Sequence, residues 1–139
     1  MNKPELEFHI PSGPWETPEG AAPGVRERTA AADAAAGHRT ALVRWEPGTD
    51  TSATGVSVHP HWEEVYILDG AMRDLTLGQT FGKGCYACRP PGMEHGPWIA
   101  EEGVTMLVLT YPDPDTAPGS SEHPSAGGSG PAPNPPAAP

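Results

Sequence analysis

One short segment of the sequence concentrates side chains that bind metal ions. Four such residues lie within six positions of VSVHPHWEE, namely His59, His61, Glu63 and Glu64, and His95 follows in GMEHG. Imidazole and carboxylate groups together suit Fe(II), Mn, Ni, Co or Zn, and open positions on the ion allow a substrate or O₂ to bind. The pattern therefore predicts a site for a divalent transition metal, with Fe(II) favoured. The other histidines lie in no such context and are interpreted as surface residues: His9, His38 and His123.

Short strands and turns surround these side chains. Residues 40–48 alternate in side-chain character before a Pro-Gly break, and residues 63–70 are rich in β-forming residues and end in Asp-Gly, which predicts a turn. Residues 56–61 are interpreted as another strand, and residues 103–112, apolar on both faces, as a central one. The alanine-rich residues 26–37 lack a stripe of large apolar side chains, so a strand end and turn are expected there rather than a helix. This pattern predicts an all-β barrel or sandwich.

Two motifs, in order along the chain, resemble those of the cupin superfamily. GCYACRPPGMEH follows the second cupin pattern, G-x5-P-x-G-x2-H, and ends at His95, with Ile99 in the place of the Asn that completes the pattern. From Glu63 to Gly70 the chain matches E-x6-G, the end of the first pattern. The finer pattern is most similar to cupins of the anti-sigma and dioxygenase-related type. The resemblance implies a small antiparallel β-barrel, or jelly roll.

Three parts of the chain are expected from this resemblance and from composition. An extended N-terminal arm covers residues 1–24, a cupin barrel covers residues 25–112, and a tail covers residues 113–139. The tail consists almost wholly of Pro, Gly, Ser, Ala and Asp. It cannot bury enough apolar surface to offset the entropy of ordering it, so we expect it to be disordered.

The resemblance leaves two sets of metal ligands open. If the chain is aligned on EEVYILDG, the two histidines of the family pattern fall at positions 57 and 59, and position 57 is serine. One set is then His59, Glu63 and His95, with a water molecule near Ser57. The other set adds His61 and takes Glu63 or the glutamate after it as the carboxylate ligand. Because alternate residues of a strand project to the same side, the two histidines of HPH could meet one ion, which favours the second set.

Cys85 and Cys88 form a C-x-x-C pair for which we expect no catalytic or metal-binding role. No second pair completes a structural zinc site. Residues three apart on a strand point to opposite faces, and the prolines at 90 and 91 exclude the helix N-terminus that a redox pair needs. Both cysteines are interpreted as small strand residues.

Large side chains near the proposed ligands predict a wall for a ligand pocket. Aromatic walls bind small organic molecules and exclude water from a metal centre. The candidates are Trp62 and Trp98, each within three residues of a proposed ligand, and Trp45, Tyr66, Tyr86 and Met72 in nearby strands.

The charge of the chain argues against polyanionic partners. The formal net charge is -10, from 8 basic and 18 acidic side chains. Without a basic cluster we expect no binding to nucleic acid or to an anionic membrane surface. No apolar run approaches a membrane span, and the N-terminus lacks the apolar region of a signal peptide, so a cytoplasmic protein is expected. The cupin resemblance implies a homodimer.

Three functions agree with these features. The first is a metal-dependent oxygenase, typically a dioxygenase, acting on a small aromatic or dicarbonyl molecule, in which Glu63 or Glu64 takes a proton from the substrate. The second is an isomerase or cyclase that uses the ion without O₂. The third is a sensor or binding module without catalysis, as in cupin-type anti-sigma factors, which is less favoured because only about 24 residues precede the barrel. Fold alone does not separate the three, because cupins support many chemistries.

Overall fold

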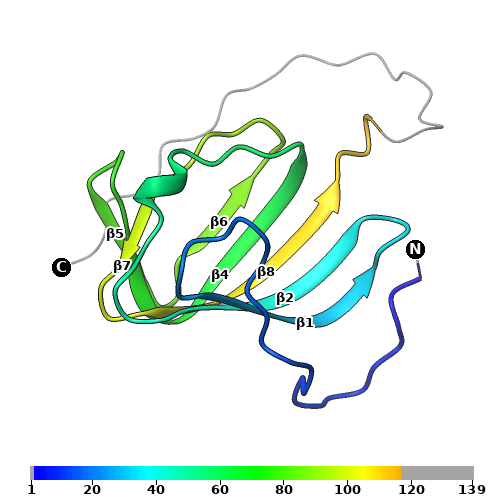
Figure 1. Cartoon of the computed structure of the whole chain (residues 1–139). Helices are drawn as coiled ribbons and strands as arrows, with labels where there is room; N and C mark the ends of the chain where they lie inside the picture. Colours follow the sequence, from blue (N-terminus) through cyan, green and yellow to red (C-terminus); the bar gives the residue numbers. More distant parts are fainter. Residues whose placement is uncertain (1, 117–139) are drawn as a thin grey trace.

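Antiparallel strands account for nearly all the regular structure of the described residues, 2–116, in this computed structural model. The elements are β1 (Val25–Asp33), β2 (His38–Trp45), β3 (Thr49–Asp50), the 3-10 turn η1 (Ser52–Thr54), β4 (His61–Asp74), β5 (Gln79–Gly82), β6 (Tyr86–Arg89), β7 (Trp98–Ala100) and β8 (Val104–Pro112). The hydrogen-bonded order is β1-β2-β8-β4-β7-β3, and β5 and β6 both pair with β4. The sheet curls into a half-barrel (Figure 1), which confirms the all-β prediction. Most of the expected tail lies outside the described residues.

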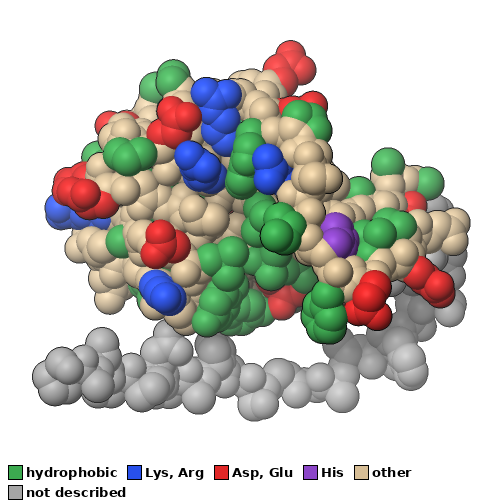
Figure 2. Space-filling model, turned by 90° about the horizontal axis from the view of Figure 1, so that it is seen from below, with side chains coloured by type: hydrophobic (Ala, Val, Ile, Leu, Met, Phe, Trp, Pro, Cys, Tyr) green, Lys and Arg blue, Asp and Glu red, His purple; other side chains and the backbone are tan. Residues whose placement is uncertain are grey.

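The core is formed by the inward faces of β2, β4 and β8. In register, Ile67 of β4 pairs with Met106 of β8, which pairs with Val43 of β2. All three side chains are buried, as the alternation of inward and outward residues in these strands requires. β8 lies between β2 and β4, which confirms that residues 103–112 form a central strand. Other apolar side chains remain at the surface, and Figure 2 shows a group of apolar side chains on the face seen from below.

The alanine-rich segment forms a strand and turn, as expected. β1 pairs with β2 from Val25 opposite Trp45 to Asp33 opposite His38. The N-terminal arm lies against this strand, because the backbone groups of Glu16 and Glu27 exchange two hydrogen bonds, 2.8 and 2.7 Å long. Among the described residues no helix is long and apolar enough to cross a membrane.

The turn predicted at Asp-Gly is wrong, because β4 continues through it. Gly70 has a positive φ of 75°, and the pairing of β4 with β8 shifts register between Ile67 and Asp69, as at a β-bulge. A Cβ at Gly70 would lie 2.2 Å from the carbonyl oxygen of Gly103, so only glycine fits this crossing. After Gly70, β4 pairs with β5 and β7 instead of β8 and β6. The strand β4 therefore belongs to both halves of the sheet. The turn comes later, where the Asp74 carboxylate accepts hydrogen bonds from the backbone amides of Thr76 and Leu77.

The strand predicted over residues 56–61 is also wrong. β4 begins at His61, and Ser57 forms only an isolated bridge with His95. Pro60, between them, has no N–H to donate to a strand pairing. His59 therefore lies in a loop before β4, and the alternation rule that paired it with His61 does not apply.

Candidate metal centre

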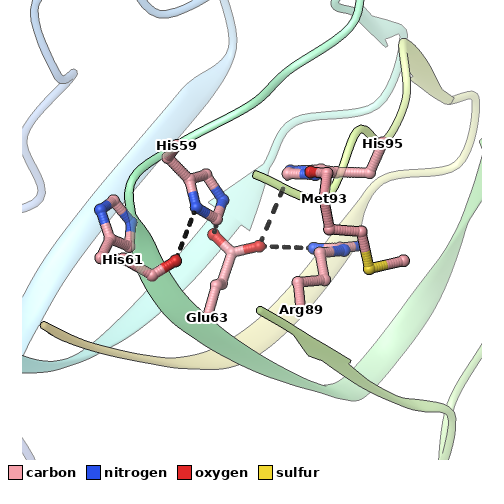
Figure 3. A network of polar contacts seen from close by, with 6 residues as sticks. All are labelled: His59, His61, Glu63, Arg89, Met93 and His95. Carbon is pink, nitrogen blue, oxygen red and sulfur yellow. Dashed lines mark hydrogen bonds and ion pairs between the residues drawn. The ribbon is translucent and has the colours of Figure 1, made fainter. Parts of the chain in front are cut away.

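Three of the expected ligands meet on the inner side of the sheet, and each comes from a different segment. Glu63 lies in β4 and shares the inward face with Val65 and Ile67. His59 lies in the loop before β4, and His95 in the loop between β6 and β7. Figure 3 shows both imidazoles directed toward the Glu63 carboxylate.

Backbone hydrogen bonds join the two loops that carry the histidines. Ser57 and His95 exchange a pair of them, with N···O distances of 2.8 and 3.0 Å. The N–H of Gly92 donates to the carbonyl oxygen of His59 at 2.9 Å. The loops are thus held side by side, which brings together two histidines that are far apart in the sequence.

The ligand atoms of the cluster are close enough to share one ion. One atom each from His59, Glu63 and His95 lies within 4.8 Å of the others. Nε2 of His59 is 3.6 Å from Oε2 of Glu63, and Nε2 of His95 is 3.9 Å from Oε1 of the same carboxylate. Two imidazoles and one carboxylate with open positions are the donor set of many Fe(II) oxygenases.

The hydrogen bonds of the two rings fix which nitrogen faces the cluster. Nδ1 of His59 lies 3.1 Å from the carbonyl oxygen of His61, and Nδ1 of His95 lies 3.1 Å from that of Met93. A carbonyl oxygen only accepts, so Nδ1 carries the proton in each ring, and the Nε2 lone pair points to Glu63. This is the arrangement that orients histidine ligands in metal sites.

One atom of the cluster lacks a partner. Nε2 of His59 is buried and has no hydrogen bond among the described residues. An unpaired buried polar atom costs about 1–3 kcal/mol, so a native structure needs a reason to keep one. A metal ion would supply the missing partner, and the three side chains fit that group.

Burial favours the neutral, metal-binding form of the histidine from the second loop. It lowers the pKa of His95 from the ordinary value, because the charged imidazolium is poorly solvated there, and the positive charge of Arg89 lowers the pKa further. The same cause, burial, lowers the pKa of His61, with a smaller contribution from His59.

Arg89 is the residue of the cluster that the sequence analysis missed. It lies directly opposite Glu63 in the pairing of β4 with β6, and its Nη1 is 2.5 Å from Oε1 of Glu63. Its side chain is 10% exposed, and the guanidinium lies 5.4 Å from the centre of the Trp98 ring. Cys85 and Ala87 of the same alternating set pack against the core. Arg89 is the next residue of this alternation, so the sequence pattern could have predicted that its side chain faces inward.

His61 and Glu64 lie outside the ligand cluster. The His61 ring stacks on the His59 ring, 4.2 Å between centroids and 3° from parallel, on the side away from His95 (Figure 3). Glu64 alternates with Glu63, so it faces the outer side of β4, where it accepts a hydrogen bond from the Tyr86 hydroxyl. The structure therefore brings together the first of the two ligand sets, and Ser57 is exposed.

A cavity of about 490 Å³ adjoins the cluster. Arg89 and His95 line it, whereas His59 and Glu63 do not, so the cluster lies at one end. The apolar lining includes Val65, Ile67, Met72, Phe81 and Trp98. Of the residues proposed as a wall, Met72 and Trp98 line this cavity with buried side chains, whereas Tyr86 borders it but has its hydroxyl on the outer side, at Glu64. By contrast, Trp62 stacks on Tyr111, 6.3 Å between centroids.

The cysteines hold no ligand position in the cluster. Cys85 is partly buried against the core and Cys88 is exposed, and both are free thiols. Both also border the cavity.

A curled antiparallel sheet with histidines and a glutamate clustered at the end of an interior cavity is typical of a cupin, and here serine at position 57 replaces one histidine of the family pattern. The family model of the ChrR cupin-like domain matches residues 8–112, and the chain belongs to this family. No curated protein shows significant sequence similarity to the chain.

Solved structures with the same fold differ in activity. The acetylacetone dioxygenase of Acinetobacter johnsonii superposes with a TM-score of 0.63 at 16% identity, covering 78% of this chain and 74% of the other. The polyketide cyclase RemF of Streptomyces resistomycificus gives 0.63 at 18%, covering 78% and 80%. The anti-sigma factor ChrR, solved with SigE from Rhodobacter sphaeroides, gives 0.54 at 24%, covering 73% and 51%. At these identities the likeness shows the fold alone.

Proposed function

We propose that His59, Glu63 and His95 hold a divalent transition metal, with Fe(II) favoured, and that the protein is an oxygenase, of the dioxygenase type, acting on a small organic molecule in the adjoining cavity. The observation that carries the proposal is the buried, unpartnered Nε2 of His59, directed at the same carboxylate as Nε2 of His95. When bound, the ion would supply Lewis acidity and a position for O₂.

The side chains of the protein have separate parts in this proposal. His59 and His95, oriented through Nδ1, bind the ion, and the apolar wall excludes water from the reacting groups. Glu63 would be the carboxylate ligand of the ion, and its Oε1 accepts a hydrogen bond from Arg89. Glu64 was the alternative proton acceptor, but it faces the outer side of β4 and takes no part in the proposal.

The test begins with the metal content of protein purified without added metal. O₂ consumption by the Fe(II)-loaded protein is then measured with aromatic and dicarbonyl compounds, and the loss of each compound is compared with and without oxygen in the buffer. His59→Ala and His95→Ala are expected to remove both metal and turnover, while the exposed His9→Ala is the control. Turnover that persists without O₂ would replace the oxygenase with an isomerase or cyclase. A wild type without stoichiometric metal would refute the site.

A second candidate is a metal-dependent sensor or binding module without turnover. The match to the ChrR cupin-like domain favours it, since ChrR was solved with the sigma factor SigE. Stoichiometric metal, together with no consumption of any compound in the panel, would favour this candidate over the oxygenase.

The same proposal includes a cytoplasmic homodimer. Two free thiols suit a reducing compartment. The outward residues Tyr66, Leu68 and Tyr86 of β4 and β6 are 44%, 37% and 58% exposed, which supports pairing through this side of the sheet. Analytical ultracentrifugation tests the dimer, and Leu68→Glu is expected to shift it to monomer.

A further inference from the structure

The cavity next to the cluster has an apolar body and one charged end. Among the described residues that line it, Arg89 is the only one with a permanent positive charge. The acidic lining residues do not offset it at close range: Oδ1 of Asp74 accepts backbone N–H groups of the following turn at 2.8 and 2.9 Å, and Glu94 is exposed. A ligand in this cavity therefore meets hydrocarbon on most sides and a guanidinium at one end.

The guanidinium has hydrogen-bond donors to spare. It carries five N–H groups in a planar fork, and among the described residues its one hydrogen-bond acceptor is Oε1 of Glu63. The side chain is only 10% exposed, and its Cζ lies over the Trp98 ring, 5.4 Å from the centroid. The remaining N–H groups are therefore held in place beside the cavity, where water or a ligand must pair with them.

The charge at this end depends on the ion. Arg89 and Glu63 form a pair without net charge, and histidines bind a metal ion as neutral imidazoles. A divalent ion adds two positive charges. Because Arg89 already balances the negative charge of Glu63, these two charges have no counter-charge. Net charge beside apolar walls is costly unless an opposite charge pairs with it. A ligand that brings a negative charge relieves this cost, whereas a neutral ligand of the same shape does not.

We infer that the cavity binds small apolar carboxylates, and that Arg89 pairs with the ligand carboxylate next to the ion. A carboxylate matches the guanidinium fork through two parallel hydrogen bonds, which a neutral amide cannot form. This inference rests on the proposed function, because the excess charge exists only when the cluster holds an ion. It narrows the substrate class from any small organic molecule to an organic acid with an apolar body.

The test compares two probes of nearly equal shape, 2-naphthoate and 2-naphthamide. Each is titrated into zinc-loaded protein of measured metal content, and binding is followed by calorimetry, which needs no turnover. Wild-type protein is expected to bind the carboxylate at least tenfold more tightly than the amide. Arg89→Met, which removes the fork and one positive charge but leaves the ion, should lower that difference several-fold and leave the affinity for the amide within about twofold. Arg89→Lys, which keeps the charge without the fork, should retain part of it.

A matched control removes another arginine. Arg44→Met changes an exposed side chain on β2 that borders the N-terminal arm and not the cavity. It should leave both affinities unchanged. Circular dichroism verifies that each variant is folded, and the wild-type comparison of the two probes does not depend on any variant.

The two proposals fail in different ways. If the wild type loads zinc but binds carboxylate and amide equally, or if Arg89→Met keeps the preference undiminished, the organic-acid inference is refuted while the metal site stands. If the wild type holds no metal, the proposed function is refuted and the inference falls with it.

Discussion

Replacement of His59 by alanine should have little effect on the stability of metal-free protein and a large effect on that of metal-loaded protein. In the metal-free protein His59→Ala removes a hydrogen bond worth about 1 kcal/mol and a stacked ring contact worth about 0.5–1.5 kcal/mol. It also removes the buried, unpartnered Nε2, which costs about 1–3 kcal/mol. The gains and losses nearly cancel, so the free energy of unfolding should change by no more than about 1 kcal/mol.

In the presence of metal the same change should be severe. An ion that binds only the folded state stabilises it by about 4 kcal/mol at a concentration 1,000 times its Kd. For a chain of this size that is roughly 10–20 °C in Tm. The wild type should show this shift on addition of zinc or Fe(II), and His59→Ala should lose nearly all of it.

Thermal unfolding followed by circular dichroism, with EDTA or with added metal, measures both quantities. A wild-type Tm that does not respond to any divalent ion would refute the reasoning, as would a His59→Ala variant that keeps the full shift. A large loss of stability in EDTA alone would show that His59 has a structural role instead.

Three further predictions address the ligand set, the long strand and the outer face. His61→Ala should keep stoichiometric metal and His95→Ala should lose it, as measured by elemental analysis, because only the second offers a ligand atom to the cluster. Gly70→Ala should cost more than about 3 kcal/mol in urea unfolding, since its Cβ would lie 2.2 Å from a backbone oxygen; Gly78→Ala, with φ of 67° and open space, should cost about 1 kcal/mol. The hydrogen bond to Glu64 raises the pKa of Tyr86 above its ordinary value, so this tyrosine contributes stability that is complete below about pH 10 and is lost as the pH rises further; Tyr86→Phe should flatten that loss in alkaline unfolding curves.

Much of the sheet could be predicted because its signals are local. The apolar character of residues 103–112 indicated a central strand, and β8 is one. Residues 26–37 lack a stripe of large apolar side chains with which a helix could pack on the core, so a strand end and turn were expected. β1 and the turn after it lie there. The failure at Asp69-Gly70 has a physical cause: a positive φ at glycine serves a bulge as well as a turn, and only the approach of Gly103 determines which.

The candidate site was predictable in its donors and not in its geometry. The types and spacing of His59, Glu63 and His95 identified all three as candidate metal ligands. The sequence could not show that Pro60 keeps His59 out of β4 and so separates it from His61. Nor could it show that Arg89 lies opposite Glu63, because that contact depends on the register between two strands far apart in the chain.

Because Arg89 lies on β6, the end of the cavity next to the ligand cluster can open when this strand frays. Within the described part of the chain, β6 has one hydrogen-bonded neighbour, β4, whereas β4 itself is paired on both sides. Four residue pairs hold β6 in place, so fraying of this edge would carry the guanidinium away from Glu63 without breaking the pairing of β4 with β8. Amide hydrogen exchange should accordingly be faster in β6 than in β8. Metal and organic acid together would give Arg89 a second partner and slow the exchange, which makes the edge strand a reporter of occupancy.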